Sequence, residues 1–233
     1  MSDALATVLI PGLNCSARLY ADQIPALWRF GAVQVADHTR DDSIAAIARR
    51  VLAEAPPRFA LAGLSMGGYL AFEIMRQAPE RVAKLALLNT GARPETPEQT
   101  AQRRPRIELA TRGRFAEVTN EHFPLLVHRD RHDDAALKNL VRKMNEETGP
   151  EAFLRQQRAI MGRADSRPGL GAIKCPTLVL VGDGDVLTPP DLAREMAAAI
   201  PGSRLAIVAD CGHLSTIEQP AAVTKTLLEW MSS

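Results

Sequence analysis

Residues 59–74 read FALAGLSMGGYLAFEI and pass from a strand pattern to a helix pattern within a few positions. Residues 59–62 form an apolar run typical of a buried strand, whereas residues 67–77 carry apolar side chains at helical spacing. Between them, residues 63–67 match the motif G-x-S-x-G, in which a serine on a sharp strand-to-helix turn projects its hydroxyl from the sheet. The stretch therefore predicts a nucleophile at Ser65; a Gly/Ser-rich turn without catalysis is the alternative interpretation.

Short apolar runs alternate with helical patterns along most of the chain. Six runs, each followed by a turn, predict strands at 7–10, 32–36, 59–62, 84–88, 177–181 and 204–208. Helices are predicted at 42–55, 67–77, 190–200 and 220–231. Strands that are apolar on both faces and separated by helices form parallel sheets covered on both sides. The predicted fold class is therefore α/β, with a mostly parallel sheet of about six strands flanked by helices.

One long segment interrupts this alternation. Residues 92–174 contain no strand-like run, and their charged, helix-forming residues predict helices at 98–112, 115–121, 134–147 and 151–161. We interpret residues 92–174 as a helical cap inserted between two sheet strands of a single domain that spans residues 1–233. A plain surface decoration is the alternative interpretation.

The composition is that of a globular protein without a charge bias. Hydrophobic residues make up 46% of the chain, and 28 Lys and Arg residues face 27 Asp and Glu residues, for a net charge of +1. Phosphate binding needs a surplus of positive charge, so this balance argues against a nucleic-acid partner. The basic run at residues 103–106 (RRPR) is interpreted as a solvated face.

The cysteines and the apolar segments predict neither a metal site nor a signal peptide nor a membrane-spanning segment. The three cysteines are widely separated and lack a CxxC spacing, so neither a metal cluster nor a disulfide framework is predicted: Cys15, Cys175 and Cys211. The N-terminal residues lack the basic and long apolar segments of a signal peptide. No apolar stretch approaches the roughly 18 residues needed to cross a bilayer. We expect a cytoplasmic protein without a membrane partner.

A neutral serine needs a base, and the base needs a residue that orients it. Two aspartates, Asp183 and Asp185, follow the predicted strand at 177–181, and His213 follows the strand at 204–208. Loops after parallel strands lie at one edge of the sheet, so both loops should approach Ser65. The chain order Ser, Asp, His fits such a site. The residues alone leave both aspartates open as the orienting acid.

Three segments resemble the α/β-hydrolase superfamily, and the resemblance spans nearly the whole chain. GLSMGGYLAFEIMRQAPERVAKLALLNT (63–90) is similar to the family's nucleophile turn with its following helix and strand. PTLVLVGDGDVLTPP (176–190) resembles its acid loop, and CGHLSTIEQP (211–220) its histidine loop. The resemblance implies Asp185, the last Asp of G-x-x-D, as the acid, with Asp183 as second choice. It implies His213 as the base.

An oxyanion hole would complete the site. One expected donor is the backbone N–H of Met66, the residue after the nucleophile. The resemblance implies a second donor in the loop after the first strand, which reads Ile10-Pro11-Gly12-Leu13-Asn14-Cys15 and makes the Leu13 N–H the match. The family commonly has His where this chain has Pro. A backbone donor does not depend on that side chain.

The resulting hypothesis is a serine hydrolase that cleaves small carboxylic esters or lactones through an acyl-enzyme intermediate. No cofactor or metal is implied, and the oligomeric state stays open. The candidate substrate-binding residues are Asn14, Cys15 and Phe123. The alternatives are a haloperoxidase-type perhydrolase, a carbon–carbon or thioester hydrolase, and a hydrolase-like protein that binds a ligand without turnover. Four other histidines are expected on the solvated surface: His38, His122, His128 and His132.

Overall fold

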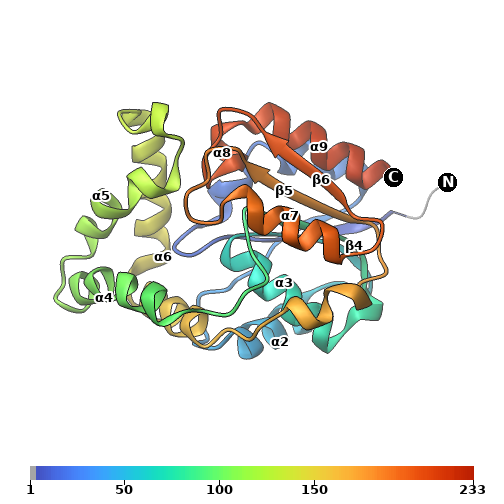
Figure 1. Ribbon diagram of the computed structural model, residues 1–233, viewed down its shortest axis with the longest axis horizontal. Helices are drawn as coiled ribbons and strands as arrows, with labels where there is room; N and C mark the ends of the chain where they lie inside the picture. The colour runs from blue at the N-terminus through green and yellow to red at the C-terminus, as the bar shows by residue number, and fades with distance from the viewer. Residues whose placement is uncertain (1–3) are drawn as a thin grey trace.

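The computed structural model describes residues 4–233, and a six-stranded sheet lies at its centre (Figure 1). Its strands run parallel to one another in the order β2-β1-β3-β4-β5-β6. Their bounds are β1 Ala6–Ile10, β2 Val33–Val35, β3 Phe59–Leu64, β4 Val82–Leu88, β5 Thr177–Gly182 and β6 Arg204–Val208. The prediction of a parallel sheet of about six strands is confirmed.

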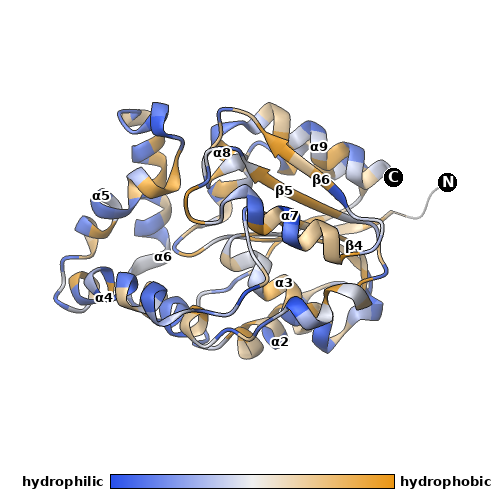
Figure 2. Ribbon diagram, viewed as in Figure 1, coloured by the Kyte–Doolittle hydropathy of each residue, from blue (hydrophilic) through white to orange (hydrophobic). Residues whose placement is uncertain are grey.

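Helices cover both faces of this sheet, as the apolar strands require. Alternate strand residues face opposite sides: Leu61 packs with helices α2, α3 and α7, whereas Leu64 packs in a second core with η1, α1 and α9. Figure 2 shows that strands such as β5 and β6 are strongly hydrophobic, whereas the helices around them carry both hydrophobic and hydrophilic residues. The bounds are η1 Ala17–Tyr20, α1 Ile24–Leu27, η2 Trp28–Phe30, α2 Ile44–Glu54, α3 Met66–Gln77, η3 Pro79–Arg81, α7 Pro190–Ala199, α8 Ser215–Glu218 and α9 Pro220–Ser232.

The predicted helical insertion lies between β4 and β5. It contains α4 Pro97–Thr111, α5 Phe115–Leu126, η4 Arg129–Arg131, α6 Ala135–Met161 and η5 Arg167–Ala172. Its three long helices stand beside the sheet, beyond one end of the strands (Figure 1). Within α6, Gly149 adopts φ 79° and ψ 162° just before Pro150, so two helical segments meet at a kink there. The predicted break between residues 147 and 151 is therefore present.

The cap helix α4 begins at a well-formed N-terminus. The Thr96 hydroxyl accepts from the backbone N–H of Gln99 (3.2 Å), and the Gln99 side chain accepts from the Thr96 N–H (3.1 Å). This reciprocal cap satisfies two backbone donors that the helix cannot pair internally.

Across residues 4–233, none of the helices combines the length and the apolar composition needed to cross a membrane.

Candidate active site

Ser65 occupies the sharp turn between β3 and α3. Its backbone has φ 56° and ψ −113°, a region that residues with a Cβ rarely adopt. The turn closes only because its neighbours are glycines: a Cβ on Gly63 would lie 2.2 Å from the carbonyl oxygen of Gly67. Such strained positions persist where the surrounding structure holds them, and they cluster at functional sites.

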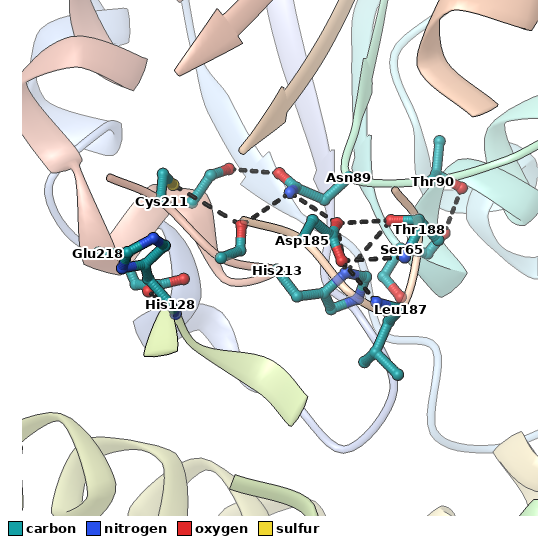
Figure 3. Close-up of polar contacts among 12 residues, drawn as sticks. Ser65, Asn89, Thr90, His128, Asp185, Leu187, Thr188, Cys211, His213 and Glu218 are labelled. Carbon is teal, nitrogen blue, oxygen red and sulfur yellow. Dashed lines mark hydrogen bonds and ion pairs between the residues drawn. The ribbon is translucent and has the colours of Figure 1, made fainter. Parts of the chain in front are cut away.

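Hydrogen bonds from β4 fix this turn. The Ser65 N–H donates to the Leu88 carbonyl oxygen (2.9 Å), and the Thr90 hydroxyl donates to the Ser65 carbonyl oxygen (2.8 Å; Figure 3). A Cβ on Gly68 would lie 2.4 Å from the Thr90 hydroxyl oxygen. The last residue of β4 and the nearby Thr90 therefore fix the turn, and only glycine at position 68 leaves space for Thr90.

The loops after β5 and β6 bring Asp185 and His213 together. The Nδ1 atom of His213 lies 2.9 Å from Oδ2 of Asp185, and both side chains are almost fully buried (Figure 3). The other oxygen, Oδ1, accepts from the backbone N–H groups of Leu187 and Thr188, each at 2.9 Å. The Thr188 hydroxyl also donates to Oδ2 (2.6 Å). Asp185 therefore accepts hydrogen bonds on both oxygens.

These contacts keep Asp185 ionised despite its burial. Burial raises the pKa of the Asp185 carboxyl, but the charge of His213 and the hydrogen bonds from His213 and Thr188 outweigh it and leave the pKa below its usual value. An ionised carboxylate beside Nδ1 favours the His213 tautomer that carries its proton on Nδ1 and leaves Nε2 unprotonated. Asp183 points elsewhere, since its Oδ1 accepts from the Cys211 N–H (3.1 Å). Of the two aspartates left open by the sequence, Asp185 contacts the histidine.

Ser65 and His213 line the same cavity, which has a volume of about 250 Å³. Leu13 and Gly12, from the loop after β1, form part of its wall. Met66 is the first residue of α3, where backbone N–H groups lack partners within the helix. Within residues 4–233, neither the Leu13 nor the Met66 N–H donates to a backbone or side-chain acceptor. Neither N–H group therefore has an acceptor among the described residues.

The three candidate substrate-binding residues lie in different places. Cys15 lines the cavity, and burial raises the pKa of its thiol to about 12, so it stays protonated. Asn14 adopts φ 58° and donates its backbone N–H to Oε1 of Gln156 (2.9 Å), which anchors the loop to α6. Phe123, on α5, is buried in the hydrophobic core and does not line the cavity.

The expectation that four histidines are solvated is wrong for three of them. His38 and His128 are buried, and His38 Nε2 lies 3.0 Å from the Gly12 carbonyl oxygen. His122 faces the cavity, where burial and the charges of nearby cations lower its pKa to about 3. Only His132 is exposed. His122 and His128 belong to the cap, and His38 accepts a hydrogen bond from the cap residue Gln156 at its carbonyl oxygen, so their burial depends on how the cap docks, which the sequence does not reveal.

Asn89 is a site residue that the sequence analysis missed. It follows β4 directly, with φ 44°, and is fully buried. Its amide nitrogen donates to Oδ2 of Asp185 (2.9 Å) and to the Gly212 carbonyl oxygen (3.0 Å), while its oxygen accepts from the Ser215 hydroxyl (2.6 Å; Figure 3). One side chain thus joins the acid loop to the histidine loop. Its place at the end of the strand between β3 and β5 was the available signal.

Glu218 is buried and links the histidine loop to the segment after α5. Its Oε2 accepts from the backbone N–H of His128 (2.6 Å), and burial raises the pKa of its carboxyl.

In the part of the chain from residue 4 onward, no group of three His, Cys, Asp or Glu side chains is placed to hold a metal ion.

Comparison with known proteins identifies the family of the chain. A model of the alpha/beta hydrolase family matches residues 8–226, which is most of the chain. The chain belongs to the alpha/beta hydrolase family. Among curated relatives of this alpha/beta hydrolase, a pimeloyl-acyl-carrier-protein methyl ester esterase of Neisseria meningitidis is 26% identical over 246 residues, covering 98% of this chain and 95% of the relative.

Two solved structures of enzymes closely match the fold of this alpha/beta hydrolase. A thermophilic esterase from Thermogutta terrifontis is 31% identical with a TM-score of 0.88, and the match covers 98% of this chain and 89% of the esterase. An enol-lactonase from Burkholderia xenovorans is 26% identical with a TM-score of 0.88, covering 100% of this chain and 93% of the lactonase.

Proposed function

We propose that this alpha/beta hydrolase cleaves carboxylic esters or lactones through an acyl-enzyme intermediate on Ser65. The observation that carries the proposal is that Ser65 and His213 line one cavity while Asp185 Oδ2 lies 2.9 Å from His213 Nδ1. A hydroxyl, an imidazole and a carboxylate in this order are the components of nucleophilic acyl transfer. The relatives named as esterases and as a lactonase support a substrate with an acyl–oxygen bond.

The proposed reaction has two steps. In the first, Ser65 Oγ attacks the carbonyl carbon, His213 accepts the hydroxyl proton and then gives it to the leaving alcohol oxygen. In the second, His213 takes a proton from water, whose oxygen attacks the acyl-enzyme, and returns that proton to Ser65. Asp185 keeps the imidazole oriented and stabilises its cationic form in both steps.

The backbone N–H groups of Leu13 and Met66 would bind the oxyanion that forms in each step. Each such donor typically lowers the barrier by about 3–4 kcal/mol, because it is fixed before charge develops. The Met66 N–H also lies at the positive end of α3. The Nε2 atom of His38 lies 3.0 Å from the Gly12 carbonyl oxygen, and this contact anchors the loop that carries Leu13.

The test is hydrolysis of p-nitrophenyl esters of graded acyl length and of a set of lactones by the wild type and by Ser65→Ala. We expect multiple turnovers by the wild type and a loss of at least a thousandfold in kcat/KM in the variant, with an unchanged circular dichroism spectrum. Ester hydrolysis by a folded Ser65→Ala protein at the wild-type rate would refute the proposal. A single burst of product without turnover would instead indicate a ligand-binding protein.

The same acyl-enzyme could be attacked by hydrogen peroxide in place of water, which would make the protein a perhydrolase. Adding peroxide to the ester assay separates these reactions, because a perhydrolase releases peracid at the expense of acid. We expect acid as the main product.

A further inference from the structure

The cap helix α4 presents a polar face to the catalytic cavity. Four of its residues line that cavity, Gln99, Gln102, Arg103 and Arg106. Their spacing of three and four residues places them along one side of the helix. A helix that covers an interior usually turns an apolar side inward. Figure 2 shows that much of α4 is hydrophilic, and its four cavity-lining residues are all polar or charged.

Two of the cavity's three arginines share one carboxylate. The buried Glu95 side chain pairs with Arg103 through Oε1 (2.6 Å) and with Arg163 through Oε2. Arg163 also lies over the Tyr69 ring, 4.6 Å from its centroid. These contacts hold both guanidinium groups in place, but one carboxylate neutralises only one of the two charges.

Arg106 is the third arginine, and it lacks a carboxylate partner within ion-pair distance among residues 4–233. Its Nε atom is buried and has no hydrogen-bond partner. Burial and the charge of Arg103 lower the pKa of Arg106, and the more distant carboxylate of Glu121 only partly offsets them. A buried donor on a cation is costly when it stays unpaired, so such a group in a cavity points to an absent anionic partner.

The other titratable groups of the wall do not supply this anion. His122 is neutral near pH 7, because its pKa lies at about 3, and Cys15 keeps its proton. Glu121 is exposed and does not line the cavity. The cap side of the cavity therefore carries excess positive charge opposite the proposed nucleophile.

We propose that Arg106, with Arg103 beside it, binds a carboxylate of the substrate, so that the substrate is a small ester or lactone with a free carboxylate away from the bond that is cleaved. This inference rests on the proposed function. The planar guanidinium group suits a carboxylate, which it binds through two parallel hydrogen bonds. The cavity of about 250 Å³ is below the usual range for drug-sized ligands, which favours a small acid over a long acyl chain.

The test compares pairs of esters that differ only in this charge. Monomethyl succinate, glutarate and adipate are each measured against the neutral methyl ester in which a methyl group replaces the carboxylate. We expect the wild type to prefer the best charged ester by at least tenfold in kcat/KM. In Arg106→Gln the ratio of charged to neutral ester should fall at least tenfold, and Arg106→Lys should give an intermediate ratio.

Arg104→Gln is the matched control. Arg104 is an exposed neighbour on the same helix and does not line the cavity, so its removal subtracts the same charge without touching the site. The ratio should stay at the wild-type value. An equal fall in both variants would overturn the inference, because it would reduce the effect to long-range charge.

Inhibition tests the site without turnover. Free glutarate should compete with p-nitrophenyl acetate at a lower concentration than inorganic phosphate, and Arg106→Gln should weaken that inhibition at least tenfold. Phosphate inhibiting as well as glutarate would overturn the assignment of a carboxylate. If Ser65-dependent hydrolysis of p-nitrophenyl acetate occurs but every charged and neutral pair reacts alike, the carboxylate site is wrong and the proposed function stands. No Ser65-dependent hydrolysis of any ester would overturn both.

Discussion

Replacing Asn89 by Asp exchanges an amide nitrogen, which donates to Asp185 and to the Gly212 carbonyl oxygen, for a charged acceptor at the centre of the site. In the wild type the Asn89 amide nitrogen donates to Asp185 Oδ2 at 2.9 Å. Asp is nearly the same shape as Asn and also tolerates the left-handed backbone found at this position, where φ is 44°. The variant therefore changes the electrostatics of the pair and little of its geometry.

The size of the effect follows from the distance between the two groups. Two unit charges 2.9 Å apart repel by about 6 kcal/mol at an effective dielectric constant of about 20. The folded variant should avoid this by taking up one proton, which then restores a donor between the carboxylates. Protonating a carboxyl with an ordinary pKa near 4 costs about 5 kcal/mol at pH 7.5 and about 1.5 kcal/mol at pH 5.

We therefore expect Asn89→Asp to lose about 5 kcal/mol of unfolding free energy at pH 7.5 and about 1.5 kcal/mol at pH 5. The sign follows from proton binding: the pKa of the pair is raised in the folded state, so the variant's stability falls as pH rises through it. Urea unfolding at both pH values measures the loss. Asn139→Asp, on an exposed face of α6, is the control and should change stability by less than about 0.5 kcal/mol. Equal losses at the two pH values would refute the reasoning.

Three further predictions concern the acid, the turn and a buried histidine. Asp185→Asn should lower kcat by about 10⁴-fold, because His213 loses the carboxylate that orients it, whereas Asp183→Asn should keep kcat within about threefold; steady-state kinetics on one ester decides, and the reverse order would reassign the acid. Gly63→Ala places a methyl group 2.2 Å from a backbone carbonyl oxygen and should cost about 3 kcal/mol or more, whereas Gly169→Ala, with open space around it, should be nearly neutral by thermal unfolding; similar melting temperatures would contradict this. Burial lowers the pKa of His38 despite its hydrogen bond to the Gly12 carbonyl, so the unfolded chain binds a proton first and stability should fall by up to about 1.4 kcal/mol per pH unit below about pH 6.5. The His38→Gln variant should lose that part of the slope in urea unfolding, and an unchanged slope would assign it to other groups.

The sheet and its surrounding helices could be predicted because their signals are local. The β3 run, the glycines around Ser65 and the helical spacing of α3 lie within about twenty residues, and each strand is followed by its own turn residues. The break in α6 was visible for the same reason, since the adjacent Gly149 and Pro150 both disfavour a continuous helix at that point.

The contacts that depend on docking could not be predicted. Arg106 faces the cavity and Arg104 faces solvent, although both belong to one basic run, because the rotation of α4 over the sheet decides which side is enclosed. His38 is buried by its contact with the loop after β1, 26 residues earlier in the chain. Such long-range contacts leave no periodic signal in a single sequence.

Covalent labelling of Ser65 tests the central claim most directly. The protein is incubated with a p-nitrophenyl phosphonate ester, and the release of nitrophenol, the intact mass and the labelled peptide are measured for the wild type and for His213→Ala. We expect one phosphonyl group per chain, located on Ser65, and labelling slowed by at least a thousandfold without the His213 imidazole. An adduct at another residue, or labelling of Ser65 at the same rate in both proteins, would contradict it.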